Sequence, residues 1–520
     1  MSWEPEAQEI VQRRSFADAL GGPAMVERQH VAGRLTIRER LGTLVDAGSF
    51  QEVGRLSGSA TYVDGMLKSV TPAPYVMGLA KIGGRDVAIG GEDFTVRGGT
   101  SWGSDRRKGG QGGFVEDLAY NYRIPLVNLI DGSGGSVTSS ARRGFSVLPG
   151  IHGFEQSVAL LGHVPVVSAV LGTAAGGPAG RAILSHMTVM VKDTSQVFAA
   201  GPPVVKRSLG ETITKEDLGG SKVAVDMAGT IDNVADTEAA AFDQLRRFLS
   251  YMPQNVWQAP PVTACNDSVD RAADGLLAIV PKNRRQPYNM RKLMGMIADL
   301  ESLFEIQPSY GRAVITSLGR LNGKPVGFIA NNPMFYGGAM DVAAARKQLH
   351  FIDLCDCFHI PLVFLVDVPG FMVGLQAEQR ATLREGMRCV HAALQATVPI
   401  LTVIIRKCYG MAGMATCDKN GLGLKIAWPS AEWGSLPIEG GVAAAYRRDI
   451  ERAPDPAARE KELEAELRAF ASPFRTAEAF AIEDVIDPRE TRAYLCRFVD
   501  AAQGRIATGL GPKPKYGVRP

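Results

Sequence analysis

The chain has 520 residues, of which 45% are hydrophobic and 21% charged, and a formal net charge of +3 at pH 7. This length accommodates about two to four domains, and the near-neutral charge gives no indication of a nucleic-acid or anionic-membrane partner. No apolar run reaches the ~20 residues of a membrane span, and the N-terminus lacks the apolar core of a signal peptide. The seven cysteines are scattered, which favours reduced thiols over a disulfide framework. We therefore expect a globular, cytoplasmic protein.

The first half of the chain begins with helical segments and then alternates strands with helices. Residues 1 to about 50 carry apolar residues at helical spacing, and from residue 74 a strand pattern begins, with a hairpin turn at Gly83 and Gly84. The elements expected after that are a helix over 105–123, a strand over 125–130, a helix over 154–162, a strand over 164–171, a helix over 181–186, short strands over 187–193 and 195–201, and a helix capped by Thr214. This alternation predicts an α/β architecture with buried parallel strands.

The region from about 250 to 290 is rich in Pro, Asn and charge, and we place a domain boundary between residues 255 and 256. The elements expected after it are a helix over 292–308, strands over 313–331, a helix over 342–359, a strand over 362–368, a helix over 377–397, a strand over 400–406 and a charged helix over 455–470. The second half therefore repeats the alternation of the first.

Three segments of the first half recur in the same order in the second half. IPLVNLIDGSGG, which starts at Ile124, matches IPLVFLVDVPGF, which starts at Ile360. The other matching pairs start at Val87 and Val326 and at Val164 and Val398. Because paired blocks at nearly one offset rarely arise by chance, we interpret the chain as two copies of one domain of roughly 220 residues.

No side-chain motif of a common catalytic class is found. The seven histidines form no HxxxH or HExxH pair, and the chain lacks a GxSxG elbow, a GxGxxG fingerprint and a GxxxxGK[ST] loop. Two glycine-rich turns that follow buried strands remain, GTAAGGPAG over 172–180 and YGMAGM over 409–414. Peptide N–H groups at such turns lie at the positive end of a helix dipole and can form an oxyanion hole, each contributing about 10²–10³ in rate. The alternative is a tight packing turn that only requires small residues.

Seven stretches of the chain match the pattern of one family. They are GRLTIRERLGTLVDAGSF (33–50), GEDFTVRGGT (91–100), VKDTSQVFAAGPPVVKRSLGETITKEDLGG (191–220), QPYNMR (286–291), NNPMFYGGAMDVAAARKQLHFIDLCDCFHIPLVFLVDVPGFMVG (331–374), RKCYGMA (406–412) and AWPSAEWGSLPIEGGV (427–442). On these stretches the chain resembles the carboxyltransferase subunits of biotin-dependent acyl-CoA carboxylases, such as the β subunit of propionyl-CoA carboxylase. The resemblance covers nearly the whole chain.

The resemblance implies two tandem crotonase-like domains related by internal duplication. Acyl-CoA is then expected on the domain formed by residues 1–255, and carboxybiotin on the domain formed by residues 256–520. Family members usually assemble as homohexamers, with the active site between the first domain of one subunit and the second domain of another. No AMKM-like biotinylation site is found in the chain, so biotin must come from a biotin carboxylase or biotin carboxyl carrier partner.

The resemblance also implies roles for backbone groups in the two turns. The amides of Gly176 and Gly177 hold the thioester enolate oxygen, and those of Met411 and Ala412 hold the ureido oxygen of biotin. The biotin nitrogen freed by loss of CO₂ takes the α-proton, so no side-chain base is needed. No metal cluster is evident in the sequence, and we expect no metal cofactor. Pro178 removes one donor but leaves those of Gly176 and Gly177.

Two regions depart from the family pattern and affect the expected substrate. The family's DSGGARIQEG is here the longer DGSGGSVTSSARRG, and the candidate substrate contacts in this loop are Gly134, Gly135, Arg142 and Arg143. The two arginines either meet CoA phosphates or a substrate carboxylate, or are solvated surface charges. In the second turn Gly413 replaces a usual Tyr, and Met414 occupies the position that tunes acyl length in the family. We therefore expect an acyl group other than the standard short one.

Three functions remain open at this point. The first is the carboxyltransferase subunit of an acyl-CoA carboxylase. The second is the corresponding subunit of a sodium-pumping, biotin-dependent decarboxylase of the methylmalonyl-CoA type, which runs the reverse transfer. The third is a non-catalytic scaffold paralogue in a hetero-hexamer.

Overall fold

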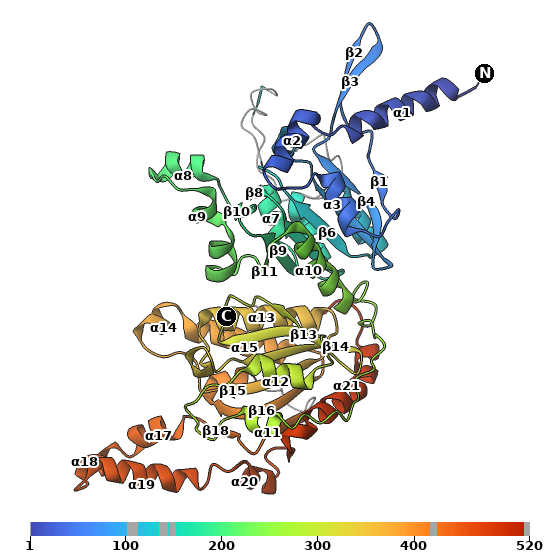
Figure 1. Cartoon of the computed structure of the whole chain (residues 1–520). Helices are drawn as coiled ribbons and strands as arrows, with labels where there is room; N and C mark the ends of the chain where they lie inside the picture. The colour runs from blue at the N-terminus through green and yellow to red at the C-terminus, as the bar shows by residue number, and fades with distance from the viewer. Residues whose placement is uncertain (1, 101–112, 135–143, 146–151, 417–423, 514–520) are drawn as a thin grey trace. The chain divides into compact units, whose positions relative to one another are not determined.

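The computed structural model describes residues 2–100, 113–134, 144–145, 152–416 and 424–513. The chain divides into two compact units, residues 1–258 and 259–520, and each is built on one large mixed β-sheet with helices packed against it (Figure 1). The predicted α/β class is confirmed.

The sheet of the first unit has seven strands in the order β1-β4-β5-β6-β7-β9-β11. β4 is antiparallel to both of its neighbours, β1 and β5, and the strands from β5 onward are parallel. The strands are β1 (Gln51–Val53), β4 (Tyr75–Ile82), β5 (Arg85–Glu92), β6 (Leu126–Ile130), β7 (Val166–Val170), β9 (Met187–Val191) and β11 (Asn233–Ala235). Every residue of β6, β7 and β9 is buried, which explains why all but one residue of each strand is apolar.

Two small sheets and a set of helices complete the first unit. The small sheets pair β2 (Gly58–Val63) with β3 (Met66–Pro72) and β8 (Thr173–Ala175) with β10 (Gln196–Phe198). The helices are α1 (Glu4–Asp18), α2 (Pro23–Val31), α3 (Ile37–Leu44), η1 (Arg97–Gly99), α4 (Phe114–Tyr122), α6 (His152–Leu160), α7 (Gly177–Ile183), α8 (Pro202–Leu209), α9 (Lys215–Gly219), η2 (Lys222–Met227) and α10 (Glu238–Tyr251). α10 packs along β7 and β9, while α4 contributes Leu118 to a separate core with Leu126 of β6.

The sheet of the second unit repeats this plan. Its order is β12-β13-β14-β15-β16-β17-β19, with β18 beside β16, and again the first pairs are antiparallel and the later ones parallel. The strands are β12 (Phe304–Ile306), β13 (Val314–Leu321), β14 (Lys324–Asn331), β15 (Leu362–Val368), β16 (Ile400–Tyr409), β17 (Leu424–Ala427), β18 (Glu432–Gly434) and β19 (Asp484–Val485). β16 is continuous where the first unit has β7 and β8 as separate strands.

Helices cover both faces of the second sheet. Phe328 packs in one core cluster with Leu293 of α12 and Leu495 of α21, whereas the neighbouring Gly327 faces Cys355 of α13 on the opposite face. The helices are α11 (Leu276–Ile279), α12 (Met290–Ile297), η3 (Tyr336–Gly338), α13 (Val342–Cys357), α14 (Leu375–Gln379), α15 (Thr382–Gln395), α16 (Gly410–Ala415), α17 (Ile438–Ala445), α18 (Arg447–Arg452), α19 (Pro456–Arg468), α20 (Pro473–Glu478), η4 (Pro488–Glu490) and α21 (Thr491–Thr508). α17 to α19 extend beyond the sheet of this unit (Figure 1).

Both units contain the same unusual turn after the hairpin strand that begins the parallel part of the sheet. In η1, Gly98 and Gly99 have φ angles of 62° and 68°, and in η3, Gly337 and Gly338 have φ angles of 61° and 89°. Glycine is favoured at such positions because it lacks the Cβ that makes positive φ costly. A shared sheet order and a shared irregular turn support the internal duplication inferred from the sequence.

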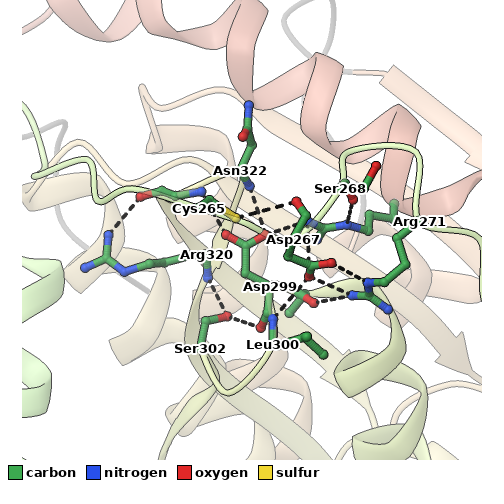
Figure 2. Close-up of polar contacts among 12 residues, drawn as sticks. Cys265, Asp267, Ser268, Arg271, Asp299, Leu300, Ser302, Arg320 and Asn322 are labelled. Atoms are coloured by element: carbon green, nitrogen blue, oxygen red, sulfur yellow. Dashed lines mark hydrogen bonds and ion pairs between the residues drawn. The ribbon is translucent and has the colours of Figure 1, made fainter.

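The helix expected over 292–308 is wrong in its second half. α12 ends at Ile297, and Phe304–Ile306 pair with β13 as an additional strand. The chain is diverted by Asp299, whose carboxylate accepts the N–H groups of Asn322 and Gly323 at 3.0 and 2.8 Å (Figure 2). Tertiary hydrogen bonds therefore override the local helical pattern here.

Other boundaries differ less. The helix expected over 377–397 is split into α14 and α15 by Ala381, whose φ of 61° is left-handed. The helix expected over 181–186 is α7, which begins earlier, at Gly177. Of the helix expected over 105–123, the structure describes α4, and residues 101–112 lie outside the described residues. Within the described residues, no helix combines the length and apolar character that crossing a bilayer requires.

Candidate active site

The first candidate turn joins β8 to α7. Gly176 is the N-cap residue of α7, with φ 61° and ψ −125°, and Gly180 N–H donates to Gly176 O at 2.9 Å. The N–H groups of a first helical turn have no partner within the helix. Since Pro178 has no N–H, the amides of Gly176, Gly177 and Ala179 are the donors available at this end of the helix.

The second candidate turn joins β16 to α16. Gly410 has a φ of 59° and begins α16, with Tyr409 as its N-cap residue. Ala412 and Gly413 are buried, whereas the side chains of Met411 and Met414 are 43% and 59% exposed. The turn therefore combines backbone N–H donors, two small buried residues, and two exposed methionine side chains.

The matching sequence blocks place Gly410 opposite Gly176. Both glycines have φ close to 60°, and each directly follows the strand segment equivalent to β8. Gly410 was not among the predicted site residues. The internal repeat could have identified it, because alignment of VPVVSAVLGTAAGG with VPILTVIIRKCYGM pairs Gly176 with Gly410.

The structure brings Gly134 against the first turn. A Cβ on Gly134, whose φ is 79°, would lie 2.5 Å from Ala175 O. Ala175 N–H donates to Gly132 O at 3.1 Å, and Ser133 N–H donates to Gly98 O at 3.1 Å. The ends of β5, β6 and β7 therefore carry three turns in backbone contact, as expected for the carboxyl edge of a parallel sheet. The predicted contacts Gly135, Arg142 and Arg143 lie outside the described residues.

The second unit shows the corresponding arrangement. A Cβ on Gly338 would clash with Asp367 O, and Met340 N–H donates to Gly370 O at 3.1 Å. Gly413 packs on Cys408, because a Cβ there would lie 3.0 Å from the Cys408 Sγ. Close packing around glycine is thus a property of both turns.

A buried charge network lies beneath the first turn. Asp131, the last residue before the 132–134 turn, accepts hydrogen bonds from Arg40 at 3.0 Å, Arg34 at 3.2 Å and Gln29 at 3.1 Å. Arg40 also pairs with Glu238 at 2.8 Å. Burial alone would lower the pKa of the Arg40 guanidinium, but the charges of Asp131 and Glu238 outweigh it and the pKa is raised. The guanidinium therefore stays charged.

A similar but smaller network lies beneath the second turn. Asp367 pairs with Arg406, whose Nη2 lies 2.9 Å from Asp367 Oδ2, and accepts the N–H of Lys407 at 3.2 Å. The Arg406 guanidinium also lies 4.9 Å from the centre of the Tyr288 ring. Sequence reasoning missed these groups. The available signal was the Asp that ends the apolar strand in both copies of the repeat.

The arrangement at each turn suits the binding of a neutral or developing anionic oxygen. Backbone donors at a helix N-terminus require no change of protonation to act. Among the described residues, no group of three or more His, Cys, Asp or Glu side chains is placed to hold a metal ion.

Comparison with known proteins gives a consistent result. The model of the carboxyl transferase domain matches residues 28–509. The propionyl-CoA carboxylase carboxyltransferase subunit of Haloferax mediterranei is 35% identical over 497 residues, covering 95% of both chains. The methylmalonyl-CoA decarboxylase subunit alpha of Propionigenium modestum is 36% identical over 497 residues, covering 95% of this chain and 94% of that one. A solved transcarboxylase 12S structure, described as a hexamer assembly with methylmalonyl-CoA bound, matches with a TM-score of 0.88 and 32% identity, covering 100% of this chain and 99% of the other.

Proposed function

Because the chain belongs to the carboxyl transferase family and has its fold of two crotonase-like domains, we propose that it is the carboxyltransferase subunit of a biotin-dependent acyl-CoA carboxylase. It transfers CO₂ from carboxybiotin to the α-carbon of an acyl-CoA. The observation that carries this proposal is the pair of equivalent amide turns, in which Gly176 and Gly410 both have a φ close to 60° at the end of corresponding strands.

In this proposal the first unit binds acyl-CoA. The N–H groups of Gly176 and Gly177 donate to the thioester oxygen, and the interaction strengthens as negative charge develops on that oxygen in the enolate. Gly134 closes the same turn through its contact with Ala175. Gly135, Arg142 and Arg143 are proposed as further substrate contacts.

The second unit receives the biotin ring. A urea carbonyl is an acceptor without charge, which fits backbone donors over the buried Ala412 and Gly413 better than it would fit a cationic side chain. The N–H groups of Met411 and Ala412 bind and orient this oxygen. Biotin supplies the carboxyl group and, once that group is lost, the ring nitrogen that accepts the α-proton. This chain contributes orientation and charge stabilisation rather than a side-chain base.

The acyl group is proposed to be one other than the standard short propionyl group. Gly413 carries no side chain, and Met414, with three rotatable bonds, forms a flexible apolar lining. A kinetic comparison of acetyl-, propionyl- and longer or branched acyl-CoA tests this point. Strict preference for propionyl-CoA contradicts it.

The partners follow from the chemistry. Biotin and its ATP-dependent carboxylation are supplied by a biotin carboxylase with a biotin carboxyl carrier. The transcarboxylase 12S relative is described as a hexamer assembly. For this chain we propose a cytoplasmic homohexamer, with each site built from the first domain of one subunit and the second domain of another.

The decisive experiment is a pull-down of the tagged full chain with a biotin blot, followed by an ATP- and bicarbonate-dependent assay over an acyl-CoA panel. Co-purification of a biotinylated carboxylase and carboxylation of one acyl-CoA support the proposal. The 36% identity to a decarboxylase subunit keeps the reverse reaction as the second candidate, which predicts a membrane β subunit as the partner instead. A non-catalytic scaffold predicts no free-biotin-dependent decarboxylation of malonyl- or methylmalonyl-CoA.

A further inference from the structure

A buried ion pair lies beside the first amide turn. Arg181 Nη2 is 2.5 Å from Glu92 Oε1, and the two side chains are 1% and 0% exposed. Arg181 lies on α7, one helical turn after Gly177, whereas Glu92 is the last residue of β5. The pair therefore joins α7, the helix that begins at the amide turn, to the end of strand β5.

The same carboxylate also holds the 132–134 turn. Asp131 N–H donates to Glu92 Oε2 at 3.3 Å. A Cβ on Gly132 would lie 2.9 Å from Glu92 Cγ and 3.1 Å from Pro178 Cγ. Glu92 thus contacts the backbone that supports Gly134, and the space between the 132–134 turn and the start of α7 has no room for another side chain.

The second unit offers an internal comparison. Asn331 corresponds to Glu92, and its Oδ1 accepts the Asp367 N–H at 3.1 Å, so the hydrogen bond to the turn is kept. Ala415 corresponds to Arg181, so the ion pair is absent at this position. A neutral side chain is therefore sufficient to form the turn after the strand.

Stability gives no reason to retain the charges in the first unit. Replacing a buried ion pair by apolar or neutral groups of similar volume is often neutral or stabilising. The ion pair instead fixes the orientation of α7. The guanidinium has a fixed planar geometry, so its bond to the carboxylate at the end of β5 restricts rotation and translation of the helix.

We propose that Glu92 and Arg181 are positioning residues that fix the Gly176 and Gly177 N–H groups relative to the acyl-CoA oxygen. This inference rests on the proposed function and deepens it. An acceptor displaced by about 1 Å costs on the order of 100-fold in rate, so a helix free to shift by that amount loses most of its effect.

The test uses a charge-neutral double variant of the full chain, Glu92→Gln with Arg181→Met. Gln keeps an acceptor for the Asp131 N–H, and the double substitution removes one charge of each sign, so the net charge is unchanged. The matched control is Asp299→Asn with Arg492→Met, because Arg492 Nη2 lies 2.8 Å from Asp299 Oδ1 with side chains 1% and 8% exposed. That pair lies in the other unit, at the hairpin turn between β13 and β14, the edge of the sheet opposite the amide turns.

Two measurements are made on each variant: kcat and KM for free-biotin-dependent decarboxylation of methylmalonyl-CoA, and amide hydrogen exchange over residues 172–184. We expect the Glu92/Arg181 variant to lose about 10–100-fold in kcat with KM within about twofold of wild type, and its 172–184 amides to exchange at least about tenfold faster. The control variant should change neither. A folded Glu92/Arg181 variant with wild-type exchange and kcat overturns the inference.

The failure of the proposed function is distinguishable. If the wild-type chain shows no turnover of any acyl-CoA, the proposed function fails, and the exchange measurement alone decides whether the pair orders the turn. Unchanged exchange in that case overturns the inference as well, and faster exchange confined to the Glu92/Arg181 variant supports it.

Discussion

Substitution of Gly134 by Ala tests the first amide turn directly. The new Cβ would lie 2.5 Å from Ala175 O, about 0.9 Å short of an ordinary contact at 3.4 Å. The Cβ is held rigidly by the backbone of residue 134 and its neighbour is a backbone oxygen, so the Ala175–Gly176 peptide must move by a similar distance. Since about 1 Å of misplacement costs on the order of 100-fold in rate, we expect kcat to fall about 100-fold, which corresponds to about 2.7 kcal/mol of transition-state stabilisation.

The control for this substitution is Gly65→Ala. Gly65 has a φ of 78°, close to the 79° of Gly134, but a Cβ there meets nothing within 4 Å. The conformational cost, about 1–2 kcal/mol of stability, is therefore common to both variants, and the steric clash is confined to Gly134. Urea unfolding measures the first effect, and decarboxylation of methylmalonyl-CoA with free biotin measures kcat. If folded Gly134→Ala keeps kcat within about twofold of Gly65→Ala, the assignment of this turn to the enolate site is refuted.

Three further predictions concern other parts of the chain. Asp131→Asn should lower the unfolding free energy by about 3 kcal/mol, because the substitution removes a buried charged partner of Arg40. Asp243→Asn, in an exposed ion pair with Arg246, should leave the unfolding free energy unchanged. Equal urea midpoints for the two variants would contradict this prediction. Met414→Ala should change the ratio of kcat/KM between propionyl-CoA and longer acyl-CoAs by about tenfold without altering Tm, and an unchanged ratio places Met414 outside the acyl site. Burial lowers the pKa of Lys347 from 10.5 to about 7, so unfolding takes up a proton at pH values between these two. The unfolding free energy should therefore rise with pH from about 7 to 10, by up to about 1.4 kcal/mol per pH unit. Lys347→Met should reduce that slope, and an identical slope would refute the buried lysine as its source.

The repeated blocks made most of the architecture predictable. β6 and β15, the strands after Ile124 and Ile360, were expected from continuous apolar runs, which buried parallel strands require. The hairpin of β2 and β3 was missed although Asp64 and Gly65 are a typical turn pair. Ala381 shows the limit of local signals, because nothing in its neighbourhood of good helix formers marks the left-handed break.

The amide turns were accessible to sequence reasoning because glycine content reports backbone geometry. The charges beneath them were not, since Asp131 and Arg40 are far apart in the chain and meet only through the packing of α3 on the sheet. The pair Glu92 and Arg181 was missed for the same reason. Local sequence pattern therefore locates the glycine-rich turns, whereas the charged groups packed beneath them are brought there by tertiary contacts.

The duplication gives this protein a freedom that a symmetric pair of identical chains lacks. In a two-fold dimer of a single-unit ancestor, every substitution appears at both amide turns at once, so neither turn can be adjusted alone. With both copies in one polypeptide, the two turns are produced in equal numbers yet mutate separately. The two copies differ in this way at the positions of the buried ion pair: the first copy has Glu92 and Arg181, and the second has Asn331 and Ala415.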